Sequence, residues 1–150
     1  MKKSIQQLQL IISGYTDQLN SLNEDDWTYK PNPAKWSRKE VLGHLIDSAQ
    51  NNIRRFIVAQ YEDNPKIAYA QDNWVRLANY QNYVTEDLVT LWVLLNKHIC
   101  MVLKSIPEGM EERMCNTGKS LSIQWLAADY NKHLLHHLHQ LLDLDPLPYP

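Results

Sequence analysis

Apolar residues recur at helical spacing in four long stretches of the chain. The first covers about Lys3 to Leu22, the second about Trp36 to Tyr61, the third Thr85 to Ile106 and the fourth Ile123 to Leu142. In each stretch the apolar side chains gather on one face of a helix, as they do in amphipathic helices that pack on a core. The pattern predicts an all-α fold, a four-helix bundle, and gives little support to a sheet.

The ends of these stretches carry capping signals. Ser37 and Glu40 have the S-x-x-E form of a capping box at the start of the second helix. Thr85 opens the third helix and Ser122 immediately precedes the fourth. Side chains of this type accept hydrogen bonds from free N–H groups of the first turn. We expect Ser37, Thr85 and Ser122 to be N-caps.

A long connection separates the second helix from the third. It begins near Asn64-Pro65, ends near Tyr83, and has room for a short helix. The whole chain is 150 residues long, which is the usual size of one domain with one hydrophobic core. We therefore expect residues 1–150 to form a single domain.

The fourth helix places two histidines on its apolar side. His137 lies within the core-facing stripe and His133, four residues earlier, lies on its edge, whereas His136 and His139 project to the other side and are expected to face solvent. Two imidazoles one helical turn apart can reach one ion, with bonds of roughly 2.0–2.1 Å. The stripe itself is Ile123, Leu126, Ala127, Tyr130, Leu134, Leu138 and Leu141.

A single histidine near an apolar face is more often a hydrogen-bonded core residue than a metal ligand, and a His-rich tract can be compositional bias. The pair favours a metal site. Burial of His133 and His137 without a partner costs desolvation free energy, whereas a shared cation accepts both imidazole lone pairs.

The second helix carries a polar line beside its apolar stripe. Its members recur at steps of four, three and four residues, and they are His44, Ser48, Asn51 and Arg55. Residues at this spacing share one side of a helix, so the line can border a cleft. The alternative is an ordinary solvated face, which fits Asp47 and Asn52 on the same helix equally well.

The segment from Trp36 to Phe56, which contains His44, together with Asp129-Tyr130 and the motif His133-x-x-His136-His137, resembles the DinB-like superfamily. The closest branch is that of the YfiT-type metal-dependent hydrolases, and the similarity spans nearly the whole chain. The resemblance implies a four-helix bundle with a long connection between its second and third helices. It also implies a nickel or zinc site, completed by water and carried here by His44, His133 and His137.

The chain departs from the YfiT pattern beside its last motif. Leu134, Leu135 and Gln140 stand where a small residue and another polar group are common, which predicts a narrower or more apolar pocket. Members of the superfamily also resemble thiol-dependent S-transferases and isomerases. Membership therefore implies metal chemistry on a small-molecule substrate without naming the substrate.

Composition narrows the function classes further. The net charge of −2, with both signs interspersed, gives no basic field for nucleic acid. Cys100 and Cys115 form no C-x-x-C motif, and with no signal peptide or long apolar run they indicate a reduced cytoplasmic setting without a membrane anchor. Trp125 projects from the polar side of its helix, which makes it a candidate contact in a homodimer.

These residues predict a divalent-metal-binding protein, with hydrolysis by an activated water as the leading hypothesis. Asp47 and Asp129 are candidates for proton transfer or for orienting a ligand imidazole. Ser48, Asn51 and Arg55 are candidates for substrate binding, although a surface ion pair is an alternative for Arg55.

Two other functions stay open. The first is transfer of a low-molecular-weight thiol, whose pKa the ion would lower. The second is a non-catalytic metal-binding or ligand-sensing bundle, in which a protein side chain closes the fourth coordination position, and His136 is the nearest residue for that role.

Overall fold

The computed structural model describes residues 1–149, and Pro150 lies outside this range. Its long helices are α1 (Lys2–Asn20), α3 (Arg38–Val58), α5 (Thr85–Ser105) and α6 (Ile123–Leu141). The predicted four-helix bundle is confirmed, and each long helix begins and ends within about three residues of the expected position.

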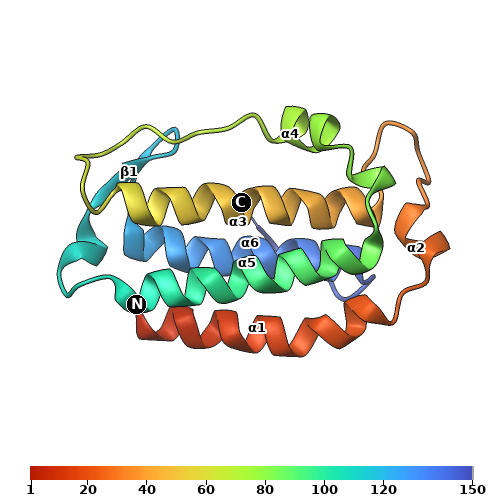
Figure 1. Cartoon of the computed structure of the whole chain (residues 1–150), viewed down its shortest axis with the longest axis horizontal. Coiled ribbons are helices and arrows are strands. Elements are labelled where there is room, and N and C mark those ends of the chain that lie inside the picture. Colours follow the sequence, from red (N-terminus) through yellow and green to blue (C-terminus); the bar gives the residue numbers. More distant parts are fainter. Residues whose placement is uncertain (150) are drawn as a thin grey trace.

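Helices α1 and α3 lie at opposite corners of the bundle, and each packs against both α5 and α6. Figure 1 shows that α3 and α5 run in the same direction, opposite to α1 and α6. The long connection after α3 makes this possible, because it returns along the outside of α3 before α5 begins.

Short elements occupy the connections. Helix α2 (Glu24–Thr28) precedes α3, and the long connection holds α4 (Gln71–Ala78) and the 3₁₀ turn η1 (Tyr80–Asn82). The short helix expected in this connection is therefore present. Tyr80 in η1 is buried, so this turn is part of the core rather than a solvated loop.

Two of the three expected N-caps are confirmed. The hydroxyl of Ser37 accepts the Glu40 N–H and the Glu40 carboxylate accepts the Ser37 N–H, while Ser122 Oγ accepts from Trp125 N at 3.1 Å. The prediction of Thr85 as an N-cap was wrong, since Val84 holds the N-cap position of α5. The Thr85 hydroxyl donates instead to the carboxylate of Glu24 in α2.

A small β-hairpin precedes α6. Strands β1 (Met114–Asn116) and β2 (Ser120–Ser122) are antiparallel, follow the 3₁₀ turn η2 (Met110–Glu112), and were not expected from the sequence. Strands of three residues are too short to show an alternating pattern. Ile67 N donates to Asn116 O at 2.9 Å, so the hairpin also fixes the start of the long connection.

The apolar stripe predicted for α6 is buried along its whole length. Among the described residues, α5 is the one helix with the length and apolar composition of a membrane span, but it packs between α1 and α3 with Leu88, Trp92 and Ile99 fully buried. Such a composition is also typical of a helix in the centre of a bundle. Trp125 is 48% exposed and contributes little to this core.

Candidate metal centre

The structure brings together the three histidines that the sequence singled out. They meet where α3 packs on α6, with one potential ligand atom of each within 4.8 Å of the others. Nε2 of His44 lies 3.0 Å from Nε2 of His133. The ring centroid of His137 lies 4.9 Å from that of His44 and 4.7 Å from that of His133.

The donor set fits a divalent cation. The Nε2 atoms of His44 and His133 face each other at 3.0 Å. Depending on the tautomers, each atom points either a lone pair or a proton at the other. A shared ion would accept a lone pair from both atoms. Neutral imidazoles suit zinc, nickel and copper. Nδ1 of His44 is buried without a hydrogen-bond partner among the described residues, so this ring depends on its Nε2 side for polar contacts.

Burial keeps these imidazoles neutral. It lowers the pKa of His44 to about 4 and that of His133 to about 2, and the neighbouring rings of the cluster add to both shifts. Burial also lowers the pKa of His137. Metal ions bind the neutral form of imidazole, so at neutral pH the cluster does not have to release protons before an ion enters.

Two polar side chains orient the rings from outside the cluster. Nδ1 of His137 donates to Gln140 Oε1 at 3.1 Å, and Nδ1 of His133 lies 3.4 Å from Ser48 Oγ. With its proton on Nδ1, each ring presents Nε2 as the ligand atom, which is the usual arrangement around metal-binding histidines. Trp36 packs beside His44, with the ring centroids 5.1 Å apart.

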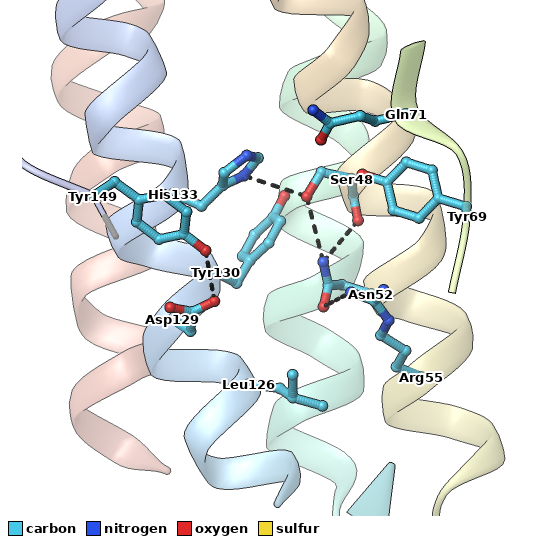
Figure 2. A pocket seen from close by; sticks show the side chains of 10 residues that line it. All are labelled: Ser48, Asn52, Arg55, Tyr69, Gln71, Leu126, Asp129, Tyr130, His133 and Tyr149. Atoms are coloured by element: carbon cyan, nitrogen blue, oxygen red, sulfur yellow. Dashed lines mark hydrogen bonds between the residues drawn. The ribbon is translucent and has the colours of Figure 1, made fainter. Parts of the chain in front are cut away.

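A cavity of about 190 Å³ opens onto His133 (Figure 2). Its wall is mainly polar, and Leu134 and Leu135 take no part in it, so the expectation of a more apolar pocket was wrong. The lining residues are Ser48, Asn52, Arg55, Tyr69, Gln71, Leu126, Asp129, Tyr130, His133 and Tyr149.

Besides His133, three of the predicted site residues, Ser48, Arg55 and Asp129, line this pocket, and Asn51 does not. The Asn51 amide is buried and donates to the backbone oxygen of Asp47 at 2.9 Å, within its own helix. The structure therefore provides no contact between Asn51 and the pocket, and a role for it in substrate binding stays a prediction.

Asp47 is not on a solvated face. It is 1% exposed, and its carboxylate accepts a hydrogen bond from the Tyr80 hydroxyl, with the two oxygens 2.5 Å apart. Burial raises the pKa of Asp47 to about 6, against the opposing effect of the Tyr80 hydrogen bond. No hydrogen bond joins Asp47 to a histidine in the described part of the chain. Asn52 is buried too, and its amide donates to Ser48 O at 2.9 Å.

Tyr149 lines the pocket although it was not among the site residues predicted from the sequence. Its hydroxyl donates to Asp129 Oδ2 at 2.8 Å, and its ring centroid lies 5.3 Å from that of His133 (Figure 2). Burial and the hydrogen bond to Asp129 raise the pKa of the Tyr149 hydroxyl well above its usual range, so it keeps its proton and acts as a donor.

The segment after α6 carries Tyr149 back along that helix, and two histidines hold it there. Nδ1 of His136 bonds to Leu147 O at 2.6 Å, and Nδ1 of His139 bonds to Asp145 O at 2.7 Å. The prediction that His136 and His139 face solvent was therefore wrong. Their side chains meet backbone carbonyls that a helical projection does not include.

The fold and the cluster together define a helical bundle with a three-histidine centre between two of its helices. The sequence profile of the DinB superfamily matches residues 7–141. The chain therefore belongs to the DinB superfamily.

Curated relatives of the chain carry the name "putative metal-dependent hydrolase". A protein of Oceanobacillus iheyensis is 32% identical over 112 residues, which are 73% of this chain and 64% of that protein. One of Halalkalibacterium halodurans is 28% identical over 114 residues, or 74% of this chain and 65% of that protein. The chain thus spans slightly less than two thirds of the length of these relatives.

Two solved structures share the fold. YfiT from Bacillus subtilis, described as a probable metal-dependent hydrolase with an unusual four-helix bundle topology, gives a TM-score of 0.85 at 18% identity, with 95% of this chain and 83% of that chain covered. A mycothiol-dependent maleylpyruvate isomerase gives a TM-score of 0.73 at 13% identity, with 97% of this chain and 61% of that chain covered.

Proposed function

We propose that this chain is a divalent-metal-dependent hydrolase that acts on a small molecule, with nickel or zinc held by His44, His133 and His137. The observation that carries the proposal is the meeting of three neutral imidazoles from two helices beside a polar pocket. Three protein ligands leave a coordination position open, as catalytic sites require. A bound ion of this kind lowers the pKa of its water and polarises a substrate carbonyl.

The surrounding residues take separate roles in this proposal. Ser48 and Gln140 hold the Nδ1 protons of His133 and His137 and so fix the two rings. Asp129 is a better candidate for proton transfer than Asp47, because its carboxylate lines the pocket and lies one turn before His133. The Asp47 carboxylate accepts a hydrogen bond from Tyr80, and neither residue lines the pocket.

A thiol-dependent transfer reaction is the second candidate. The observation in its favour is the structural similarity to a mycothiol-dependent isomerase. In that case the open position would receive a low-molecular-weight thiol as the thiolate, and turnover would require added thiol. A hydrolase turns over without it.

A non-catalytic bundle requires a fourth ligand from the protein. The nearest residue, His136, bonds through Nδ1 to Leu147 O, and the cluster found among the described residues contains only the other three histidines. We therefore favour an open position.

A reduced cytoplasmic setting is part of this proposal. Cys100 and Cys115 are both free and buried, in keeping with a reduced cytoplasmic location and with a packing role for both. A single domain, and a homodimer through the exposed Trp125, stay predictions that sedimentation analysis can test.

Metal content tests the proposal directly. Mass spectrometry of tag-free protein should find about one nickel or zinc ion per chain, and folded His44→Ala, His133→Ala and His137→Ala variants should lose it. His98→Ala is the matched control, because His98 is an exposed histidine on α5. Full metal occupancy in the folded triad variants would contradict the proposal. Hydrolysis of ester and amide substrates, abolished by a chelator and restored by metal, then separates an enzyme from a binding protein.

A further inference from the structure

Arg55 places a positive charge in the pocket without a direct counter-ion. Its Nε donates to Ile67 O at 3.1 Å and its Nη1 donates to Asn52 Oδ1 at 3.3 Å. The guanidinium also lies 5.8 Å from the ring centroid of Tyr69. Among the described residues no carboxylate lies within the 4.0 Å that defines an ion pair with Arg55. Neutral partners thus hold a guanidinium that stays charged.

The other charged group in the pocket wall, the Asp129 carboxylate, already has a hydrogen-bond partner. Asp129 is the one carboxylate in the lining, and it accepts the Tyr149 hydroxyl. The formal charges of Arg55 and Asp129 cancel, and an imidazole that ligates a metal ion is neutral. A divalent ion beside this pocket therefore leaves two positive charges without compensation, which favours an anionic ligand in a partly desolvated site.

We infer that the substrate of this site carries a carboxylate, which Arg55 binds at the end of the pocket away from the metal centre. The inference rests on the proposed function, because it assigns the reacting group to the ion and the carboxylate to Arg55. Figure 2 shows His133 and Arg55 on opposite sides of Ser48 and Asn52, and all four residues line the same cavity.

The dimensions of the pocket define the substrate further. A volume of about 190 Å³ is below the 300–1,000 Å³ typical of pockets for drug-sized ligands. His44 and Arg55 are eleven residues apart on α3, which corresponds to roughly 16 Å along the helix axis before the two side chains shorten the gap. The ligand is therefore a small, extended molecule with its carboxylate and its reacting group at opposite ends.

Paired thiol probes test this assignment without knowledge of the reaction. A thiolate binds the open position of a cobalt-loaded site and gives a charge-transfer absorption band, so its affinity can be titrated. The series 3-mercaptopropionate, 4-mercaptobutyrate and 6-mercaptohexanoate is compared with the alcohols of the same chain lengths. The two members of each pair differ only in whether the far end carries a carboxylate.

In the wild-type protein we expect at least one acid to bind about tenfold more tightly than its matched alcohol. The preference should increase once the chain is long enough to reach Arg55. Arg55→Gln should reduce the acid-to-alcohol ratio to about one, whereas Arg54→Gln, which removes an exposed charge from the neighbouring position, should keep it. A purely structural role of Arg55 would weaken both members of a pair equally.

Each result decides the question. Equal affinities for acid and alcohol at every chain length in the wild-type protein overturn the inference, even if Arg55→Gln does not fold. If cobalt does not bind at all, the proposed function fails, and the same pairs are then compared as thermal stabilisers of the metal-free protein. Stabilisation by the acids alone, lost in Arg55→Gln, would support the carboxylate site independently, and its absence would overturn it.

Discussion

The ring of Tyr80 lies directly against the backbone of Gly43. A Cβ atom added at Gly43 would come within 2.1 Å of Tyr80 Cδ2, far inside contact distance. Gly43 immediately precedes the first histidine of the cluster, and the Tyr80 hydroxyl donates to Asp47 one turn further along α3. The long connection is therefore fastened to α3 beside the histidine cluster.

Replacement of Gly43 by alanine should destabilise the protein, since the ring and the turn that carries it must move. We expect a loss of about 1–3 kcal/mol in the free energy of unfolding, measured in urea. Gly14→Ala is the control, because Gly14 is also inside a helix but has no atom within 4 Å of an added Cβ. That variant should gain about 0.4–1 kcal/mol. Equal effects of the two substitutions would refute the contact.

Asp47 should give the stability a pH dependence that Asp47→Asn lacks. Burial raises the pKa of Asp47 in the fold to about 6, above its ordinary value of 3.8, so the folded state holds the proton more tightly than the unfolded state. The associated stabilisation is complete below pH 3.8 and is lost as the pH rises through about 6. The wild-type protein should therefore lose stability relative to Asp47→Asn between pH 4 and pH 7, as followed by urea unfolding.

In this comparison the titration of the histidines is common to both proteins and cancels. A stability difference that stays constant across the pH range would show that Asp47 does not titrate as described.

Zinc or nickel should stabilise the metal-free chain through the histidine cluster. At a free metal concentration one hundred times the Kd, the gain is about 2.7 kcal/mol. For a chain of this length that gain corresponds to a rise in Tm of roughly 5–10 °C, measurable by calorimetry. His44→Ala should abolish the rise and His98→Ala should keep it. An equal rise in Tm in the two variants would show that the metal binds at a site other than the histidine cluster.

Ser48→Ala should weaken metal binding without removing a ligand. The substitution removes the hydroxyl that lies 3.4 Å from Nδ1 of His133 and frees that ring to turn. We expect a loss of about tenfold in affinity, at the lower end of the usual range because the contact is long. Competition with a chromophoric chelator measures the change. Ser13→Ala, on the exposed face of α1, is the control, and an identical affinity for wild type and Ser48→Ala would exclude the role of the hydroxyl.

The sequence predicted the bundle and the histidine pair of α6 because both follow from repeats along single helices. His133 and His137 share a face through their four-residue spacing, and the S-x-x-E pattern fixes the start of α3. That His44 meets them across the interface depended on the resemblance to the superfamily, since helical spacing describes only one helix at a time.

Other features depend on tertiary contacts that leave no periodic signal. Tyr149 enters the pocket from an irregular segment, and Asp47 is buried because Tyr80 arrives from a distant turn. Thr85 has the residue type of an N-cap, yet its hydroxyl donates to the Glu24 carboxylate of another helix. In each case a partner far away in the sequence decided where the side chain points.

Residues 44 and 133 are 89 positions apart, so the proposed ion between them would act as a removable cross-link between α3 and α6. Closing so long a loop restricts the unfolded chain, and a chain that holds its ion should open α6 to proteases less often than one that has lost it. The supply of metal in the cell would then determine how long each molecule survives, as well as whether it is active.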